Sequence, residues 1–459
     1  MRADVVILGA GSAGEMLATL LANSGKSVLI IESNLIGGEC PFYSCMPSKA
    51  MLRSAASRFD ATHTMEVGAT SSALQLDDRQ SAFATAVARR EKICEGHSDL
   101  ASLQNLTKIG VTVVRGLGTI TKSGVVTVNE TAIAYDQLVI STGSVPVVPP
   151  IPGLLQTGVW STDQALSSPE LPDSLIVIGG GPAGCELAQI YSRFGTRVTI
   201  VESEQRLLLK EEESISLALG EMFKAEGIEL LFGTPIATAE ISENGDATII
   251  LTDGRRLKAD RLLIATGRKP MVEGIGLDQL EIKINEHGAI VTDSYCRVKG
   301  QENVWAAGDV AGIAPLVHTA NYQARIIAAG ILGQNRIANY ESIPRTVYTF
   351  PAVASVGKSY VDAIAAGIDA ITARYDLKDT SRNTVDGSSG GLLTLTANRE
   401  SRTIIGAAAI GPHADEWIAE AVLAIRAQIP LETLVDLVHA FPTYSQAYEE
   451  PYRKLLSDL

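Results

Sequence analysis

Two stretches of the chain share one pattern of apolar and polar positions. Residues 5–14 read VVILGAGSAG and residues 175–184 read LIVIGGGPAG, each an apolar run followed by G-x-G-x-x-G. A helical pattern follows, and then a second apolar run that ends in an acid, Glu32 or Glu202. Continuous apolar runs are typical of buried parallel strands, so each stretch predicts a strand–turn–helix–strand unit. The offset between the copies is 170 residues throughout, from 9 to 179 and from 32 to 202.

Each glycine of the pattern meets a backbone requirement of dinucleotide binding. The first allows the tight turn, the second lets the backbone approach a pyrophosphate, and the third lets helix and sheet pack closely. The helix N-terminus offers free N–H groups to phosphates, and the acid can hydrogen-bond the ribose. The pattern therefore predicts two dinucleotide sites. Their candidate residues are Gly9, Gly11, Gly14 and Glu32 in the first copy, and Gly179, Gly181, Gly184 and Glu202 in the second.

The acid of the second copy bears on the choice of nucleotide. The negative carboxylate of Glu202 would repel the negative 2′-phosphate of NADP, whereas sites for NADP usually present arginine there. Arg206 is close in sequence and leaves NADP open as the less favoured cofactor. We therefore expect NAD in the second site.

Bulk composition excludes several classes of protein. With 38 basic and 52 acidic residues the formal charge is −14, which argues against a nucleic-acid or membrane partner. The N-terminus runs directly into a short apolar strand, too short for a secretory or spanning segment, and we expect a cytoplasmic enzyme. Five cysteines in 459 residues are not a disulfide framework. Cys94, Cys185 and Cys296 are scattered and are expected to be packing residues.

The other two cysteines lie together in residues 37–49, GGECPFYSCMPSK. A regular helix rises about 7.5 Å over the five residues from Cys40 to Cys45, beyond the usual Cα separation of a disulfide. A bridge would need an irregular segment, and Pro41 favours one. The alternatives are two buried thiols or half of a metal site. No Cys/His pair with matching ligand spacing occurs elsewhere, so we expect no metal.

This segment resembles the GGxCxxxGCxPSK motif of the class I pyridine nucleotide-disulfide oxidoreductases, which include dihydrolipoamide dehydrogenase, glutathione reductase and mercuric reductase. The resemblance extends over essentially the whole chain. Residues 138–143 (LVISTG), 262–267 (LLIATG), 303–309 (NVWAAGD) and 352–357 (AVASVG) look like further family motifs, in the family's order. The resemblance implies FAD in the first site and further cofactor-binding residues, which are Thr142, Gly143, Gly267, Arg268, Gly308 and the ribitol-binding Asp309.

The resemblance also implies roles for the residues of the redox centre. Cys45 would be the charge-transfer thiol beside the flavin, and Cys40 the interchange thiol that meets substrate. Lys49 would lie near the flavin ring, where a cation stabilises the reduced form. Glu186 matches the acid that pairs with this lysine.

The chain departs from the family near its C-terminus. Most members have a histidine–glutamate pair in H-P-T-x-x-E, contributed by the partner subunit, whereas residues 439–446 here read HAFPTYSQ. Phe441 and Gln446 occupy the two positions, and phenylalanine cannot transfer a proton. The candidates for a replacement group are His439, Tyr444, Tyr448 and Glu449, although His439 matches a position that is often non-catalytic. Thr443 and Gln446 also have the spacing of a capping box that would open the last helix.

Several functions stay open from the sequence. The favoured one is an NAD(P)H oxidoreductase of the dihydrolipoamide dehydrogenase type, a homodimer whose active site is shared between subunits. Phenylalanine at the histidine position is also seen in 2-ketopropyl coenzyme M oxidoreductase/carboxylase, which suggests dithiol-dependent thioether cleavage and carboxylation. Metal reduction like that of mercuric reductase, or a non-catalytic redox-sensing flavoprotein, are further alternatives. The substrate could accordingly be a small disulfide, a thioether, a quinone or a metal ion.

The predicted architecture is an α/β fold with two Rossmann-like dinucleotide-binding domains plus a C-terminal α+β dimerisation domain. The FAD domain is expected over residues 1–150 and 270–340, the NAD domain over 151–269 and the dimerisation domain over 341–459. A long helix is expected within residues 60–110, where the stretch around residues 83–97 is rich in Ala, Arg and Glu. Residues 376–389, rich in Asp, Ser, Thr and Gly, predict an exposed loop.

Overall fold

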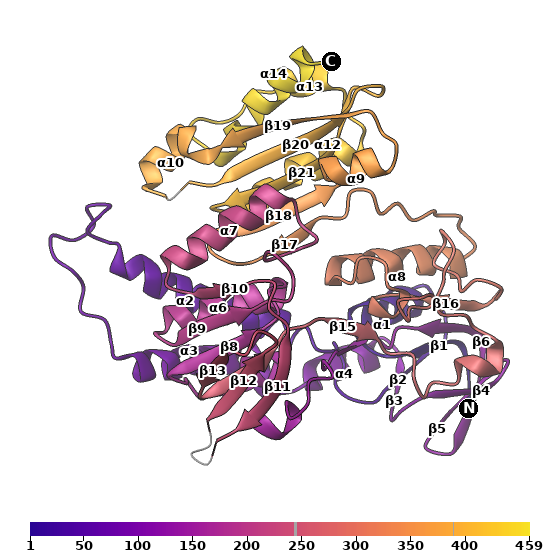
Figure 1. The fold of residues 1–459 in the computed structure, drawn as a ribbon. Coiled ribbons are helices and arrows are strands. Elements are labelled where there is room, and N and C mark those ends of the chain that lie inside the picture. Colours follow the sequence, from indigo (N-terminus) through magenta and orange to yellow (C-terminus); the bar gives the residue numbers. More distant parts are fainter. Residues whose placement is uncertain (243–245, 389) are drawn as a thin grey trace. The chain divides into compact units, whose positions relative to one another are not determined.

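The computed structural model describes residues 1–242, 246–388 and 390–459 of the chain (Figure 1). Backbone contacts divide it into two compact units. Unit 1 comprises Met1–Pro47, Glu91–Val147 and Gly267–Asn339, and unit 2 comprises Ser48–Arg90, Val148–Thr266 and Tyr340–Leu459. Helices α2 (Cys45–Thr62) and α3 (Arg79–Ile93) each contain residues that belong to unit 1 and residues that belong to unit 2. Helix α3 confirms a long helix within residues 60–110, where one was expected.

Unit 1 contains a seven-stranded sheet in the order β3-β2-β1-β6-β5-β4, with β16 also paired to β6. Strands β3, β2, β1, β6 and β16 run parallel, while β4 and β5 are antiparallel additions. The sheet strands are β1 (Arg2–Leu8), β2 (Val28–Glu32), β3 (Thr112–Arg115), β4 (Thr119–Lys122), β5 (Val125–Val128), β6 (Thr131–Ile140) and β16 (Val304–Ala306).

Helices cover the central strands of this sheet, which explains their unbroken apolar sequence. Leu17 and Leu21 of one covering helix pack with Ile7, Ile30 and Ile327 in a single core cluster. The covering and connecting helices are α1 (Ser12–Asn23), η1 (Glu95–His97), α4 (Leu100–Lys108), η3 (Leu277–Leu280), η4 (Asp309–Ala311) and α8 (Val317–Ile331). A separate two-stranded ribbon pairs β7 (Ser144–Pro146) with β15 (Arg268–Pro270).

Unit 2 repeats the parallel arrangement in a smaller sheet, β10-β9-β8-β14, beside a three-stranded antiparallel sheet, β11-β12-β13. Its strands are β8 (Ser174–Ile178), β9 (Arg197–Val201), β10 (Glu229–Leu231), β11 (Ile236–Ile241), β12 (Ala247–Leu251), β13 (Arg256–Ala259) and β14 (Arg261–Ile264). Its helices are η2 (Leu155–Thr157), α5 (Thr162–Ser167), α6 (Pro182–Arg193) and α7 (Glu213–Ala225). The two predicted strand–turn–helix–strand units are therefore confirmed.

The C-terminal part of unit 2 is a five-stranded antiparallel sheet, β17-β18-β21-β20-β19. One face packs against helices whose large side chains include Trp417, Tyr448 and Tyr452, as an α+β fold requires. The strands are β17 (Arg345–Val347), β18 (Ala352–Gly357), β19 (Ala370–Asp376), β20 (Leu392–Asn398) and β21 (Thr403–Gly411). The helices are α9 (Tyr360–Ala365), η5 (Leu377–Asp379), α10 (Ser381–Asp386), α11 (Ala414–Trp417), α12 (Ala419–Arg426), α13 (Leu431–Val435), η6 (Tyr444–Tyr448) and α14 (Glu449–Ser457).

The loop predicted over residues 376–389 was wrong for most of its length. Strand β19 extends to Asp376, and η5 and α10 follow it. The side chain of Thr380 accepts a hydrogen bond from the Asn383 backbone N–H at 3.1 Å, and Gly387 ends α10 in the left-handed conformation. The polar residues that suggested a loop are helix caps, which favour the same residue types as loops. Ser389 lies outside the described residues.

Within the described ranges, no helix is long and apolar enough to cross a membrane.

Candidate active site

The first glycine-rich turn, in unit 1, has the geometry that dinucleotide binding requires. Gly9 has φ +98°, and a Cβ there would lie 2.4 Å from the carbonyl oxygen of Ser141. A Cβ on Gly14 would lie 2.0 Å from the carbonyl oxygen of Gly9, so α1 can approach the turn only with glycine there. Gly11 begins α1 without a side-chain cap and has open space at its Cβ position. The helix N–H groups are therefore left for a phosphate.

Glu32 ends β2 beside this turn and is buried, with 8% of its surface exposed. Its carboxylate accepts hydrogen bonds from the backbone N–H groups of Ala10 at 2.6 Å and Asn34 at 2.7 Å. These bonds fix the acid at the carboxyl end of the strand, where the ribose of a bound nucleotide would lie.

The second turn, in unit 2, repeats this geometry almost atom for atom. Gly179 has φ +109°, with its Cβ position 2.5 Å from the carbonyl oxygen of Ala265, and a Cβ on Gly184 would lie 2.1 Å from the Gly179 oxygen. Gly181 begins α6 and again has open space. Glu202 accepts from the Gly180 N–H at 2.6 Å, as Glu32 does from Ala10. Both turns thus fit a dinucleotide, and the roles of their residues toward FAD and NAD stay predictions.

Arg206, the residue that left NADP open, already has partners in the protein. Its guanidinium donates to the backbone carbonyls of Leu208 at 3.2 Å, Leu209 at 2.8 Å and Glu211 at 3.0 Å. Binding a 2′-phosphate would require the side chain to leave these carbonyls. The local geometry therefore favours NAD over NADP.

Asp309, the predicted ribitol-binding acid, belongs to a chain of polar contacts within unit 1. Its carboxylate accepts from the Ser144 hydroxyl at 2.5 Å, and Arg268 Nε donates to that hydroxyl at 2.8 Å. Arg268 also pairs with Glu39, with 2.7 Å between the charged groups. Ser144 and Glu39 were missed by sequence reasoning. Glu39 directly precedes Cys40, so this network joins the start of the thiol segment to Asp309.

The remaining cofactor-binding residues predicted from the sequence include three glycines with positive φ. Gly143 and Gly267 have φ of +76° and +109°, and Gly308 has +77°. The Thr142 hydroxyl donates to the Met271 carbonyl at 2.6 Å. Left-handed backbone at these positions explains the glycines, because L side chains rarely adopt it.

Cys40 and Cys45 are both partly exposed, and regular helix begins only at Cys45. Before it the chain makes tight turns from Glu39, whose carbonyl accepts from the N–H of Tyr43 at 2.7 Å. The Met46 N–H donates to the carbonyl of Cys40, six residues earlier, at 2.9 Å. The prediction of an irregular segment is confirmed.

Lys49 lies one turn after Cys45 on α2 and forms an ion pair with Glu186 of α6. Its ammonium is 3.1 and 2.9 Å from the two carboxylate oxygens. The lysine side chain is 35% exposed and that of Glu186 only 7%. Glu186 also accepts from the Tyr348 N–H at 2.9 Å, and the ammonium lies 4.5 Å from the centre of the Tyr348 ring. The predicted Lys49–Glu186 pairing is confirmed, while Tyr348 was not foreseen.

Phe441, at the position of the family's histidine, is 73% exposed, and Val438 on the same segment is 96% exposed. The capping box predicted from Thr443 and Gln446 is confirmed: the Gln446 side chain accepts from the Thr443 N–H, and Thr443 caps η6 in return. Gln446 is thus committed to local structure.

The groups considered as substitutes for that histidine have partners inside the dimerisation domain. His439, with 8% of its side chain exposed, lies 3.0 Å from Glu420 and 3.3 Å from Glu449. The buried Tyr444 donates to Asp386 at 3.2 Å, and Tyr448 to the Trp417 carbonyl at 3.3 Å. Burial, followed by the nearby Asp386, raises the pKa of Tyr444 to about 12. Each of these groups therefore stabilises its own domain.

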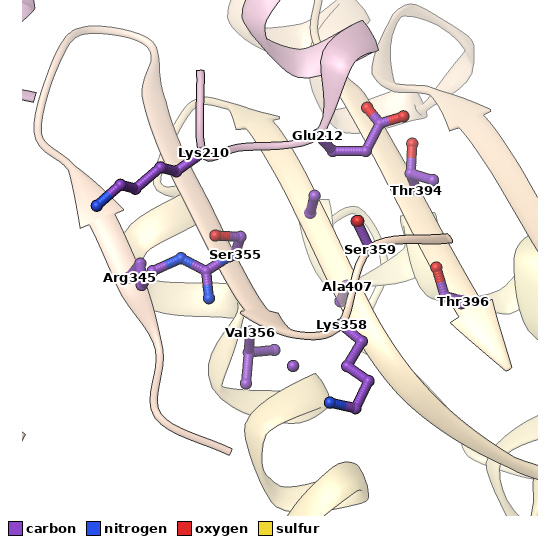
Figure 2. Close-up of a pocket in the computed structure, with 12 residues that line it drawn as sticks. Lys210, Glu212, Arg345, Ser355, Val356, Lys358, Ser359, Thr394, Thr396 and Ala407 are labelled. Atoms are coloured by element: carbon purple, nitrogen blue, oxygen red, sulfur yellow. The ribbon is translucent and has the colours of Figure 1, made fainter. Parts of the chain in front are cut away.

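Unit 2 also contains a small pocket (Figure 2). Lys210, Arg345 and Lys358 lie around it, and Arg345 is neutralised by Glu211 through contacts of 3.0 and 3.1 Å. None of the predicted nucleotide or thiol residues is among those that line it, so it is not a candidate for those sites.

Comparison with known proteins agrees with this geometry. The family model "Pyridine nucleotide-disulphide oxidoreductase" matches residues 3–324, and the model of that family's dimerisation domain matches residues 343–452. A dihydrolipoyl dehydrogenase of Chlorobaculum parvum is 35% identical, covering 97% of this chain and 96% of that protein. A mercuric reductase of Streptomyces lividans is 31% identical, covering 99% and 97%.

Two solved structures are similar along their whole length. LpdA from Mycobacterium tuberculosis superposes with a TM-score of 0.87 at 25% identity, covering 99% of each chain. The Cu(II) complex of the HOCl-induced flavoprotein disulfide reductase RclA from Escherichia coli gives 0.86 at 25% identity, covering 98% of this chain and 99% of that one.

These matches confirm the fold class, two Rossmann-like domains followed by a dimerisation domain. They also confirm the expected cofactors, FAD and NAD(H), and an oxidoreductase activity on a sulfur group. A homodimer that acts on a small disulfide-type molecule follows from the dimerisation domain and the relatives. The chain belongs to the pyridine nucleotide-disulphide oxidoreductase family.

Proposed function

We propose that the protein passes electrons from NADH, through FAD, to a Cys40–Cys45 disulfide, and from the resulting dithiol to a small molecule. FAD, when bound, supplies the exchange of two electrons between a hydride donor and thiols. The first glycine-rich turn, Glu32, Gly308 and Asp309 would hold FAD, with Thr142, Gly143, Gly267 and Arg268 at the junctions. The second glycine-rich turn and Glu202 would hold NADH.

Within the redox centre, Cys45 is proposed to face the flavin and Cys40 to meet the substrate. Lys49 would place a positive charge beside the reduced flavin, where negative charge develops. Glu186 would act as a positioning residue that orients the ammonium. This assignment is supported chiefly by one observation, the Lys49–Glu186 pair fixed at 3.1 and 2.9 Å one turn after Cys45.

A disulfide substrate would be reduced to two thiols by two successive thiolate attacks. The Cys40 thiolate attacks one substrate sulfur, releasing the other as a thiol after it gains a proton. The Cys45 thiolate then attacks Cys40, which restores the protein disulfide and releases the second thiol. One NADH and one proton regenerate the dithiol. Overall, NADH, a proton and the disulfide give NAD⁺ and two thiols.

The proposal is tested by anaerobic titration with NADH, and separately NADPH, of the wild type, Cys40→Ser and Cys45→Ser. Alkylation of thiols followed by peptide mass spectrometry should show Cys40 and Cys45 becoming reduced in the wild type. A long-wavelength thiolate–flavin absorbance band should require Cys45. Flavin reduction that leaves both cysteines unchanged and produces no such band would refute the relay.

The absence of a histidine at residue 441 limits the substrates that react well. Phe441 of the partner subunit is proposed to border the thiol site and cannot donate a proton to a departing thiolate. His439 and Tyr444 are held by carboxylates of their own domain. Ordinary dialkyl disulfides and lipoamide should therefore turn over slowly. A quinone or an activated disulfide, whose leaving group is stable as an anion, should react faster.

Metal reduction is a second candidate function. It is favoured by the similarity to a mercuric reductase and to a copper complex of RclA. Two thiolates can bind a soft divalent ion, and this step needs no proton donor. NADH oxidation that depends on Hg²⁺ or Cu²⁺ and on both cysteines would establish it. Oxidation that depends on bicarbonate and a thioether would instead identify the carboxylase alternative, and no turnover with any acceptor would favour a redox sensor.

The proposed domain boundaries are residues 1–150 and 270–340 for FAD, 151–269 for NAD and 341–459 for dimerisation. We also propose a cytoplasmic location, supported by the requirement for NADH and by a Cys40–Cys45 disulfide that must be repeatedly reduced to the dithiol.

A further inference from the structure

The segment between the two cysteines makes an aromatic contact through Tyr43, at a position that the family motif leaves open. Tyr43 lies in the middle of residues 40–45, and its ring stacks on the imidazole of His97, with 4.9 Å between the ring centres and 22° between the planes. Both residues belong to unit 1. His97 ends η1 (Glu95–His97), far from Tyr43 in sequence.

A charged contact and the local backbone conformation hold His97 in this position. Its Nε2 lies 3.3 Å from a carboxylate oxygen of Glu91, and its side chain is 21% exposed. Nδ1 is buried and has no hydrogen-bond partner among the described residues. Glu95, Gly96 and His97 have φ of 51°, 61° and 59°. Non-glycine residues are strained in this conformation and keep it only where their surroundings fix them.

The stack bears on the geometry of the dithiol. A disulfide forms only when the two cysteine Cα atoms lie within about 4.4–6.8 Å of each other with suitable orientation. Tyr43 is part of the chain that sets this separation. If the Tyr43 side chain is held in place, the segment has fewer conformations in which the cysteines are apart. This lowers the entropy cost of closing the disulfide loop.

We propose that His97 is a positioning residue for the Cys40–Cys45 pair: by stacking on Tyr43 it favours the disulfide over the dithiol and sets the potential at which the pair is reduced. The inference rests on the proposed redox role of this pair. Glu91 supports His97 through its contact with Nε2, and neither residue is assigned a proton transfer.

The test compares His97→Ala, His97→Phe and the wild type in their FAD-bound form. Each protein is equilibrated in buffers of defined oxidised and reduced dithiothreitol, and the reduced fraction of Cys40 and Cys45 is measured by alkylation and peptide mass spectrometry. Because His97→Ala removes the aromatic contact, we expect it to lower the equilibrium constant for disulfide formation about threefold to tenfold. The potential would then rise by about 14 to 30 mV. His97→Phe, which keeps a ring, should restore most of the wild-type value.

His63→Ala provides a matched control, because His63 packs against Phe59 with 4.2 Å between ring centres and neither residue lies in the cysteine segment. It should leave the equilibrium constant unchanged. If His97→Ala does not fold, Tyr43→Leu removes the stack from the other side and should give the same shift. An unchanged constant in His97→Ala or Tyr43→Leu, or an equal shift in His97→Phe and His97→Ala, overturns the inference.

The proposed function and the positioning role of His97 can fail separately. If NADH does not reduce Cys40 and Cys45 in the wild type, the proposed function fails. If NADH reduces them and the His97 variants match the wild type, only the positioning role fails.

Discussion

Lys49 and Glu186 form a two-oxygen ion pair, 3.1 and 2.9 Å long, between the helix that begins at Cys45 and the helix that begins at the second glycine-rich turn. The carboxylate is almost buried, and it also accepts from the Tyr348 N–H. The Glu186 carboxylate thus restrains both the Lys49 ammonium and the backbone at Tyr348, which directly follows β17. The buried carboxylate thus holds the ammonium in one place although the lysine side chain is 35% exposed.

Replacing Lys49 by methionine should slow reduction of the flavin by NADH by about tenfold to a hundredfold, near the lower end of the losses seen when an electrostatic group is removed. The methionine retains the length of the side chain but not its charge. Stopped-flow absorbance of the flavin measures the rate. Glu186→Gln should slow it less, because the lysine remains.

Lys269→Met is the control for this prediction, since Lys269 pairs with Glu273 at 2.9 Å and both side chains are exposed. Exposed pairs contribute about 0–1 kcal/mol, so stability and rate should both stay close to the wild type. A rate unchanged by Lys49→Met would remove the lysine from the proposed redox centre.

Introducing histidine at residue 441 should increase activity on ordinary disulfides. In Phe441→His combined with Gln446→Glu, turnover of a dialkyl disulfide should rise at least about tenfold, because a positioned acid–base group contributes about 100-fold or more in favourable cases. The glutamate can keep the capping contact with the Thr443 N–H. Steady-state oxidation of NADH with the disulfide measures the gain.

Val438→His serves as the matched control, because Val438 is 96% exposed on the same segment as Phe441. It adds an imidazole without placing it at the family position. If it raises turnover as much as the Phe441→His variant does, the effect comes from a general surface histidine and not from that position.

The dinucleotide units could be predicted from sequence because each glycine answers to a backbone distance that is local to the turn. A Cβ on Gly14 would meet the oxygen of Gly9, five residues earlier. The capping box at Thr443 and Gln446 is local in the same way. The Lys49–Glu186 pair connects distant residues, and it was foreseen only through the family resemblance.

Contacts between distant residues without a motif could not be foreseen. Arg268 pairs with Glu39, and His97 stacks on Tyr43, through folding of the chain that no local pattern records. The error at residues 376–389 has another cause. Thr380 and Gly387 act as helix caps there, and a short helix with caps has the composition of a loop.

Nucleotide preference should depend on Glu202. We expect the wild type to have a KM for NADPH at least about tenfold above that for NADH, because the carboxylate repels a 2′-phosphate and Arg206 is occupied by carbonyls. Glu202→Ala should reduce this ratio by weakening NADH and relieving repulsion of NADPH. Glu204→Gln, an exposed neighbour, should leave the ratio unchanged. A wild type that binds both nucleotides equally would contradict the assignment.

Ionisation of Tyr444 should lower the stability of the protein only at alkaline pH. Its pKa is raised from 10.0 to about 12 in the folded protein, first by burial and then by Asp386. The folded state therefore holds the proton more tightly, so its contribution is present below pH 10 and is lost as the pH rises from 10 toward 12. Urea unfolding from pH 8 to 11 should show a smaller alkaline loss in Tyr444→Phe than in the wild type. Equal losses would show that the tyrosine ionises normally.

His439 should prove structural. Its side chain is 8% exposed between Glu420 and Glu449, and Tyr452 donates to the other oxygen of Glu420 at 3.1 Å. His439→Phe would leave two carboxylates facing an apolar ring, at a cost of about 1–3 kcal/mol in the free energy of unfolding. Because the imidazole is occupied inside its own domain, the pH dependence of turnover should not change. A variant that folds with wild-type stability but loses an ionisation from its pH–rate profile would show that His439 supplies the proton that Phe441 cannot.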